Sequence, residues 1–298
     1  ENKVKCKDLS IAILDEQHIF GLKQRSKLRK KNTYPPHVLV MTATPIPLTL
    51  AMSVYGNVYI SIIDELPPVR KAIKTVNRYD SHRLKVFRFI REEIKKKRQV
   101  YIVYPLIQES AKMDYKDLMD GYESIARDFP APEYQISIVH GKMKPPDKEF
   151  EMQRFIKGQT QIMVATTVIE VGVNVPNASV MIIESAERFG LSQLHQLRGR
   201  VGRGDKESSC ILMFKSNLSV NAKKRINILK DSNDGFYISE EDMKIRGFGD
   251  ILGFKQSGIK NFKLADPVHN SDLFLLAEHC GLSAQVLTLR CLPVRSRL

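Results

Sequence analysis

The chain has 298 residues, 43% of them hydrophobic, and its 47 Lys and Arg against 33 Asp and Glu give a net charge of +14. The apolar content excludes a wholly disordered chain, and no run of about 18 uncharged apolar residues occurs, so we expect no membrane span. The length predicts about two domains. The charge predicts a polyanionic partner without distinguishing RNA, DNA and anionic lipid.

The N-terminal part of the chain contains short apolar runs separated by polar segments. We expect strands at 10–14 and 38–41, and a third at 59–63. Pro67-Pro68 then breaks the pattern and indicates a linker. Glu1 is not a natural first residue, and we expect the sequence to be cut from a longer protein.

The rest of the chain alternates strand-like and helix-like segments. Leu84, Phe87 and Ile90 recur at helical spacing, and Pro145 and Gly158 fit the start and the end of one helix. The expected strands are 100–104, 136–139, 162–165, 180–183 and 211–214, and the expected helices are 84–94, 115–129, 145–157, 192–201, 221–230 and 239–245.

This alternation predicts βαβ units, and therefore an α/β fold with a mainly parallel sheet flanked by helices. Ligands of such sheets bind beyond the carboxyl ends of the strands. Three polar clusters fall at such ends, namely Asp15-Glu16, Thr42 to Thr44 and Thr166-Thr167. This coincidence is the first indication of a functional site.

The acidic pair Asp15-Glu16 could serve metal-assisted hydrolysis. One carboxylate can hold Mg²⁺, usually through water, while its neighbour orients or deprotonates an attacking water. An acidic pair after a strand is common, however, and a helix N-terminus also favours negative charge. The pair alone therefore leaves both interpretations open.

The threonine clusters also leave two interpretations open. The hydroxyls of Thr42 and Thr44 could relay hydrogen bonds between a nucleotide site and a polymer track, or could simply cap a turn. Those of Thr166 and Thr167 could contact nucleic-acid phosphates, or could mark an ordinary exit from a strand.

The segment from Gln196 to Arg203 is more specific. Gln193, Gln196, Arg200 and Arg203 are spaced by 3, 4 and 3 residues, which predicts one side of a helix. The glycines at 199 and 202 each cost about 1 kcal/mol in a helix interior, and a merely solvated basic helix would not need them. Guanidinium groups suit the charge that develops on a transferred phosphoryl group.

Two further features bear on whether this chain binds phosphate groups. The phosphate-binding motif G-x-x-x-x-G-K-[ST] occurs nowhere in it, so ATP is expected to be poorly held by this chain alone. Lys95-Lys96-Lys97-Arg98 ends an expected helix, where cations complement the helix dipole, and this favours a solvated surface over a binding site.

Eight segments together carry a resemblance to the motor of superfamily 2 helicases, and in particular to the RecG family. In chain order they are LDEQHIFG, VLVMTATPIPLTLA, IDELPPVR, VYPLIQES, HGKMKP, VATTVIEVGVNVPNA, ERFGLSQLHQLRGRVGRG and DGFYISEEDMKIRGFGDILGFKQSG. The resemblance runs from about Leu9 to about Ala277, with the motifs in the family's order.

The resemblance implies a RecA-like fold in four parts. Residues 1–78 would be the C-terminal remnant of motor domain 1, and residues 79–217 the complete motor domain 2 with its parallel sheet. Residues 218–265 would form a translocation hairpin and loop, followed by a tail at 266–298. From about Cys280 the tail has no acidic residue and no family pattern, and our hypothesis is a shifted reading frame.

The resemblance also implies the roles of individual residues. Asp15 would hold Mg²⁺ and Glu16 would activate water, while Arg200 and Arg203 would be arginine fingers for ATP. The remaining implied sites are the ATP site and its coupling (His18, Gln196, Gly172, Asn174), DNA coupling (Thr42, Thr44, Thr166, Thr167) and translocation (Arg246, Gln256).

The implied parent is a monomeric, cytoplasmic bacterial helicase, associated with the nucleoid, that uses ATP and Mg²⁺ to remodel branched double-stranded DNA. Its N-terminal wedge and its phosphate-binding loop are missing here, so we expect no ATP turnover by the isolated chain. Ile19 and Leu48 replace the family's usual arginines, and Asn174 its usual aspartate. Two alternatives are a transcription-repair coupling translocase and a non-catalytic DNA-binding module with a helicase fold.

Overall fold

The computed structural model describes residues 9–15, 36–42, 61–63, 65, 71–105, 111–166, 175–204 and 206–246, with the backbone alone at 111–117 and at 246. The chain divides into two compact units, residues 1–46 and 47–298. Each unit is described by itself.

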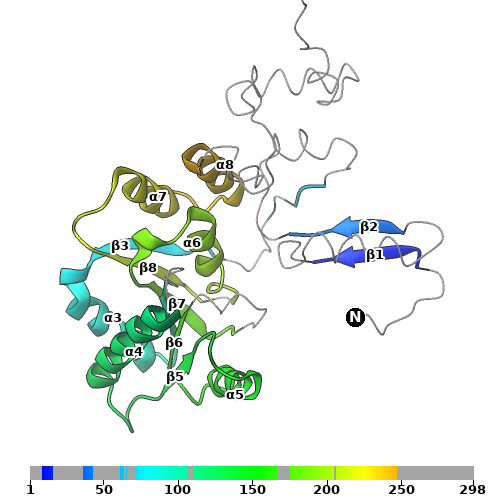
Figure 1. Ribbon diagram of the computed structural model, residues 1–298. Helices are drawn as coiled ribbons and strands as arrows, with labels where there is room; N and C mark the ends of the chain where they lie inside the picture. The colour runs from blue at the N-terminus through cyan, green and yellow to red at the C-terminus, as the bar shows by residue number, and fades with distance from the viewer. Residues whose placement is uncertain are drawn as a thin grey trace, which may run out of the picture. The chain divides into compact units, whose positions relative to one another are not determined.

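The first unit contains a parallel pair of strands, β1 (Ile11–Leu14) and β2 (His37–Val40) (Figure 1). Both strands are confirmed. Ala12 and Leu14 are buried, whereas Ile11 and Ile13 on the alternate positions are more than half exposed. The strand expected at 59–63 is not seen in its described part, because residues 61–63 form no regular structure.

The second unit is built on a six-stranded sheet in the order β3-β8-β7-β4-β6-β5. All of its described pairings are parallel, as expected. The strands are β3 (Lys74–Tyr79), β4 (Gln99–Tyr104), β5 (Ile136–Val139), β6 (Ile162–Thr166), β7 (Ala178–Ile183) and β8 (Ser209–Phe214).

Strand β3 is the element that the sequence analysis misses. It lies at the edge of the sheet, beside β8, and its residues are half-buried or exposed. Because it carries Lys, Asn and Arg, it lacks the apolar run that marks a strand buried on both faces. The sheet therefore begins five residues before residue 79, at Lys74.

Helices cover both faces of this sheet, which gives three layers (Figure 1). One apolar cluster joins the sheet to α3 and α4, and a second joins the opposite face to α5, α6, α7 and α8. The helices are α3 (Arg83–Lys95), α4 (Ala111–Asp128), α5 (Pro145–Ile156), α6 (Leu191–Arg198), α7 (Val220–Asp231) and α8 (Gly235–Arg246), with short 3₁₀ turns η2 (Asp80–His82) and η4 (Ala186–Arg188).

Side chains of β4 show how the two layers share the sheet. Val100 and Ile102 belong to the cluster with α3 and α4, while Tyr101 and Val103 belong to the other cluster. This alternation is the period of 2 that a pleated strand imposes. Helices α7 and α8 pack on the same face of the sheet as α6. This places the expected hairpin, residues 218–265, against the segment from Gln196 to Arg203, which we call the arginine segment.

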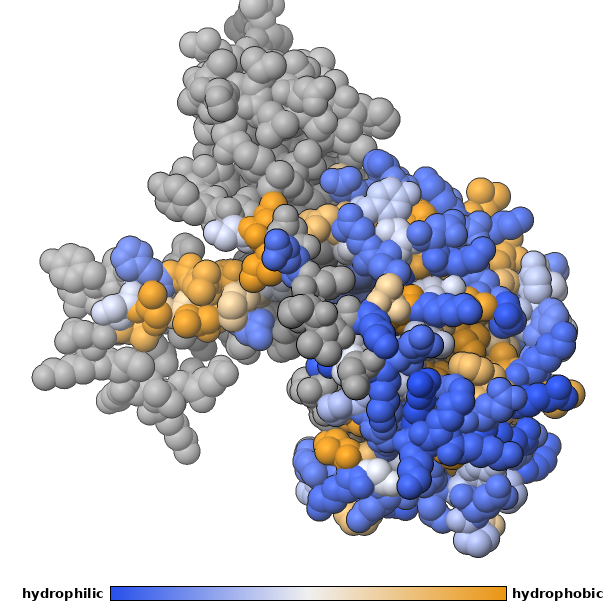
Figure 2. Space-filling view, turned by 180° about the vertical axis from the view of Figure 1, so that it is seen from behind, coloured by the Kyte–Doolittle hydropathy of each residue, from blue (hydrophilic) through white to orange (hydrophobic). Residues whose placement is uncertain are grey.

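The surface of the second unit is mostly hydrophilic on the side seen in Figure 2, whereas apolar residues lie on the surface of β1 and β2. Among the described helices, none combines the length and the apolar character that crossing a membrane requires.

Candidate functional site

The carboxyl edge of the six-stranded sheet brings together several polar groups. Thr166 ends β6 and lies opposite Tyr104, which ends β4. Thr166 is only 2% exposed, and its Oγ1 has no hydrogen-bond partner among the described residues. Burial, with the Glu184 carboxylate nearby, raises the pKa of Tyr104. A hydroxyl that is buried without a partner is unusual.

An ion pair that the sequence analysis misses stands at the same edge. Glu184 follows β7 and accepts two hydrogen bonds from Arg83, at 2.7 and 2.8 Å. Arg83 also donates from Nε to Asp80 at 3.0 Å. Burial alone would lower the pKa of Arg83, but the carboxylates of Glu184 and Asp80 outweigh this effect, and the pKa is raised. An acidic residue directly after an apolar strand was the available signal, the same one that marks Asp15.

His140 follows β5 at this edge as well. Burial, together with the charge of Lys142, lowers the pKa of its imidazole. At neutral pH the neutral ring is therefore favoured, which makes a charge-assisted contact to phosphate less favourable there.

The arginine segment differs from its expected form. Helix α6 ends at Arg198, and Gly199 caps it, so the prediction of one helix from Ser192 to Val201 is wrong. Gly202 has a φ of +73°, a left-handed conformation that no α-helix continues through. Arg200 and Arg203 therefore lie on a loop and do not share a helix face with Gln193 and Gln196.

The start of α6 differs as well. Gly190, not Ser192, is the N-cap, and its backbone N–H donates to Oε1 of Gln193 at 3.1 Å. The hydroxyl of Ser192 donates instead to the buried carboxylate of Asp242 in α8. This hydrogen bond connects the arginine segment to the second helix of the hairpin.

The two glycines of the loop permit close packing on either side of Arg203. A Cβ at Gly202 would lie 3.0 Å from Cγ1 of Ile73, and one at Gly204 would lie 3.2 Å from the carbonyl oxygen of Pro176. Arg203, between them, is exposed. The glycines therefore serve close approach, not a helix, and they hold an exposed guanidinium on a tightly packed loop.

Electrostatics place both arginines near one residue of the sheet. Burial raises the pKa of Tyr101 in β4 to about 12, and the charges of Arg203 and Arg200 oppose the rise. Both guanidiniums therefore act on the same phenol, on the sheet face that carries α6. The loop leads into β8, so these arginines lie toward the amino edge, and Thr166 lies at the opposite edge.

Arg198 is a structural residue that the sequence analysis overlooks. Its guanidinium is buried, and Nη1 donates to the carbonyl oxygens of Leu229 and Ser232, both at 2.7 Å. These carbonyls lie at the C-terminal end of α7, where the helix dipole favours a cation. Its spacing of four residues from Leu194 places it on the apolar side of α6, a signal that was available in the sequence.

The remaining site predictions divide according to what the structure describes. Asp15 and Thr42 follow β1 and β2 in the first unit, Gln196 lies on α6, and the backbone of Arg246 ends α8. Among the described residues, no group of three or more His, Cys, Asp or Glu could hold a metal ion. Outside the described residues lie Glu16, His18, Thr44, Thr167, Gly172, Asn174 and Gln256, together with Ile19 and Leu48.

Comparison with known families decides the affiliation. The helicase conserved C-terminal domain matches residues 84–205, and the C-terminal part of domain 3 of the ATP-dependent DNA helicase RecG matches residues 232–284. ATP-dependent DNA helicase RecG of Bacillus subtilis is 48% identical over 272 residues, and that of Escherichia coli K12 is 47% identical over 270. The chain belongs to the RecG family.

The RecG relatives are much longer than this chain. The alignments cover 91% and 89% of the chain but 39% of each of those two relatives. A RecG structure bound to a three-way DNA junction superimposes with a TM-score of 0.69 and 38% identity, over 92% of this chain and 34% of that one. The chain therefore spans about a third to two-fifths of these RecG proteins.

The fold itself is the RecA-like fold of superfamily 2 helicases, as expected. RNA-bound Dbp5 L327V of Saccharomyces cerevisiae is 14% identical, with a TM-score of 0.51, and it supports the fold alone. The RecG domain 3 match begins at residue 232 and includes all of α8. The segment expected to be the translocation hairpin thus partly matches RecG domain 3.

Proposed function

We propose that this chain is part of an ATP-dependent helicase that translocates on double-stranded DNA and remodels branched DNA, such as reversed replication forks and Holliday junctions, in recombination and repair. The observation that carries the proposal is the order of the two family matches on one chain. The helicase C-terminal domain is followed by the RecG-specific domain. The RecG relative bound to a three-way DNA junction supports branched DNA as the partner.

In this proposal Arg200 and Arg203 face the phosphates of ATP. Their glycine-flanked loop supports the role, because the backbone is fixed while the Arg203 side chain stays exposed. A guanidinium can stabilise the charge of a transferred phosphoryl group by bidentate hydrogen bonds. Gln196, on α6, together with His18, Gly172 and Asn174, completes the ATP site and its coupling.

Asp15 and Glu16 fit a magnesium site in kind, since carboxylate oxygens are the ligands that Mg²⁺ prefers. The ion, when bound, neutralises phosphate charge. Asp15 would hold the ion, and Glu16 would accept the proton of the attacking water. Asp15 stands directly after the buried end of β1.

On the DNA side, Thr42, Thr44, Thr166 and Thr167 contact the strand, and Arg246 and Gln256 convert motor closure into movement. The buried hydroxyl of Thr166, with no hydrogen-bond partner among the described residues, supports a contact made when DNA is bound. The contacts of α6 with α7 and α8 support transmission from the arginine loop to the hairpin.

The test compares ATP hydrolysis by the 298-residue chain with that by a full-length RecG-family protein carrying this sequence. We expect DNA-stimulated turnover in the full-length protein only, because the chain lacks the phosphate-binding loop and an arginine finger contributes its roughly 10³–10⁵-fold only to a held nucleotide. Arg203→Ala should lower turnover by at least about 10²-fold, whereas the exposed Arg127→Ala in α4 should not. Full turnover by Arg203→Ala would refute the assigned role, whereas no turnover by the unmutated full-length protein would favour a DNA-binding module without chemistry.

DNA binding by the chain alone tests its basic surface. We expect weak binding to junction DNA, with log K falling as log salt rises, because phosphate contacts release counterions. We also propose that the parent protein is cytoplasmic and associated with the nucleoid, and we expect it to sediment as a monomer. A salt-independent affinity would contradict the use of the positive charge.

A further inference from the structure

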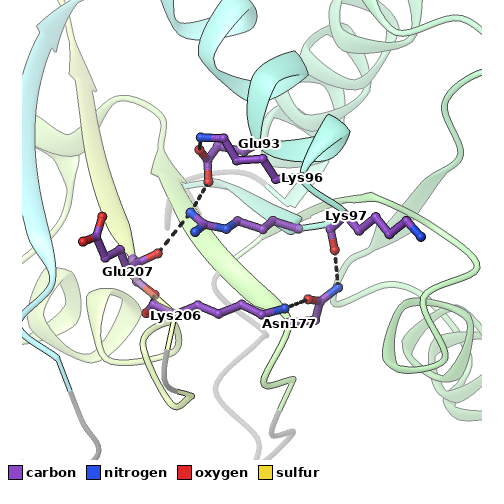
Figure 3. Close-up of polar contacts among 8 residues, drawn as sticks. Glu93, Lys96, Lys97, Asn177, Lys206 and Glu207 are labelled. Carbon is purple, nitrogen blue, oxygen red and sulfur yellow. Dashed lines mark hydrogen bonds and ion pairs between the residues drawn. The ribbon is translucent and has the colours of Figure 1, made fainter.

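A network of polar contacts ties together the residues that lead into β4 and β7 and those that precede β8 (Figure 3). Its centre is Asn177, directly before β7. Nδ2 of Asn177 donates to the carbonyl oxygen of Lys97 at 2.7 Å, and Oδ1 accepts from Nζ of Lys206 at 2.6 Å. The backbone carbonyl of Asn177 accepts from Gln99 at 3.0 Å. One residue thus connects three separate stretches of chain.

The Lys97 side of this network is firmly anchored. Glu93 is 3% exposed and accepts from Lys96 at 2.8 Å and from Arg98 at 2.6 Å. Arg98 also donates to the carbonyl oxygen of Glu207 at 3.3 Å. Lys97 itself has a φ of +61°, so its carbonyl direction is set by the left-handed turn that ends α3. The acceptor that Asn177 uses therefore has little freedom to move.

The Lys206 side of the network belongs to the arginine loop. Lys206 follows Arg203 by three residues, and Gly204 between them packs against the carbonyl oxygen of Pro176, the residue before Asn177. The contact of Gly204 with Pro176 and the hydrogen bond of Lys206 to Asn177 thus join the same two segments of the chain. On the other side of Arg203, Gly202 packs against Ile73. The loop thus packs against Ile73 on one side and against Pro176 on the other. On the Pro176 side, Asn177 adds a hydrogen bond to Lys206.

We propose that Asn177 is a positioning residue for Arg203. By holding Lys206 against the residues that lead into β7, it keeps the loop in the one arrangement in which Arg203 can reach a nucleotide. This inference rests on the proposed role of Arg203 in ATP hydrolysis.

The expected effect on turnover follows from geometry. An arginine finger contributes about 10³–10⁵-fold to the rate, and a displacement of about 1 Å can cost about 10²-fold. Removal of one exposed hydrogen bond loosens the loop without unfolding it, so we expect a fall in kcat of about tenfold. The KM for ATP should stay within about twofold, since nucleotide binding depends mainly on the phosphate-binding loop elsewhere in the parent.

The test measures steady-state ATP turnover, at saturating junction DNA, in a full-length RecG-family protein that carries this chain's residues. Asn177→Ala and the exposed Lys206→Met should each lower kcat about tenfold, and Lys206→Arg should restore it to within about threefold because a guanidinium can also donate to Oδ1. Gln153→Ala is the matched control, since it removes an exposed side-chain hydrogen bond to Glu149 on α5. It should change neither kcat nor KM.

A double-mutant cycle decides whether Asn177 acts through Arg203. In an Arg203→Ala background, Asn177→Ala should lower kcat by less than about twofold further. An equal tenfold loss in both backgrounds would overturn the inference, as would normal turnover by Asn177→Ala and Lys206→Met while Arg203→Ala abolishes it. If Arg203→Ala alone leaves turnover intact, the proposed function of Arg203 fails first, and the two failures are distinguished.

Discussion

Replacement of the buried Arg198 tests whether α6 and the hairpin form one structural unit. Arg198→Met keeps the length of the side chain and its apolar stem but removes the guanidinium. The carbonyl oxygens of Leu229 and Ser232, each 2.7 Å from Nη1, then lose a charged donor at the end of α7. A methionine offers them nothing in return.

The magnitude follows from these two hydrogen bonds. A hydrogen bond to a charged group contributes about 1.5–3 kcal/mol. Part of this is recovered because a buried guanidinium no longer has to be desolvated. We therefore expect the free energy of unfolding to fall by about 3 kcal/mol. Arg198→Lys should lose less, because an ammonium keeps the charge at the helix C-terminus but lacks the fork of donors.

Urea denaturation of the 298-residue chain measures this loss. With a slope of about 2–3 kcal/mol per molar urea, the unfolding midpoint of Arg198→Met should fall by about 1–1.5 M at an unchanged slope. The control is Arg127→Met in α4, where the arginine is exposed, and its midpoint should not move. A loss below about 0.5 kcal/mol for Arg198→Met would refute the view that this residue binds α6 to α7.

Three further substitutions test local features of the second unit. Lys97→Gly should stabilise the chain by about 1 kcal/mol in urea denaturation, because glycine adopts the φ of +61° without strain. Gly121→Ala should destabilise it by about 1–3 kcal/mol by the same measurement, because the new Cβ would overlap the ring of Tyr104. Burial alone would raise the pKa of Glu93, but hydrogen bonds from two basic neighbours lower it, so its stabilisation is present above about pH 4.3 and lost as pH falls further. Glu93→Gln should therefore flatten the acid limb of stability against pH, and an unchanged limb would exclude this carboxylate as its source.

Within the six-stranded sheet, the strands that the sequence predicts have no exposed residue. The strands β6 and β7 are buried at every position, and their apolar runs, 162–165 and 180–183, are the segments that the sequence predicts. The edge strand β3 carries no such run, so composition could not reveal it. Only its partner β8 and the covering helix α7 specify it, and both are distant in sequence.

Periodicity predicted where helices lie better than which side faces the core. Helix α3 is confirmed, but Leu84, one of the residues on which its prediction rests, is 77% exposed, and Glu93 is buried instead. Glu93 can be buried because Lys96 and Arg98 pair with it. The run of Lys95 to Arg98, interpreted from sequence as a solvated surface, thus includes two residues that compensate a buried charge, which no composition rule shows.

The arginine loop shows why a correct choice of residues came with a wrong local structure. The spacing of Gln196, Arg200 and Arg203 fits a helix only if the chain passes helically through Gly199 and Gly202, and the positive φ of Gly202 prevents this. Residue spacing cannot distinguish a glycine that a helix tolerates from one that ends it. The deciding contacts, to Ile73 and Pro176, lie more than 25 residues away along the chain.

The order of the sheet explains why those contacts are made. In the sheet, strand β8 lies between β3 and β7, and all three strands are parallel. The residues that lead into β8 must therefore lie between those that lead into β3, at Ile73, and those that lead into β7, at Pro176 and Asn177. A Cβ at these flanking positions would lie 3.0 Å from Ile73 and 3.2 Å from Pro176, so the neighbours would have to shift. The topology thus favours small residues on both sides of Arg203, and the exposed arginine between them owes its position to the place of β8 in the sheet.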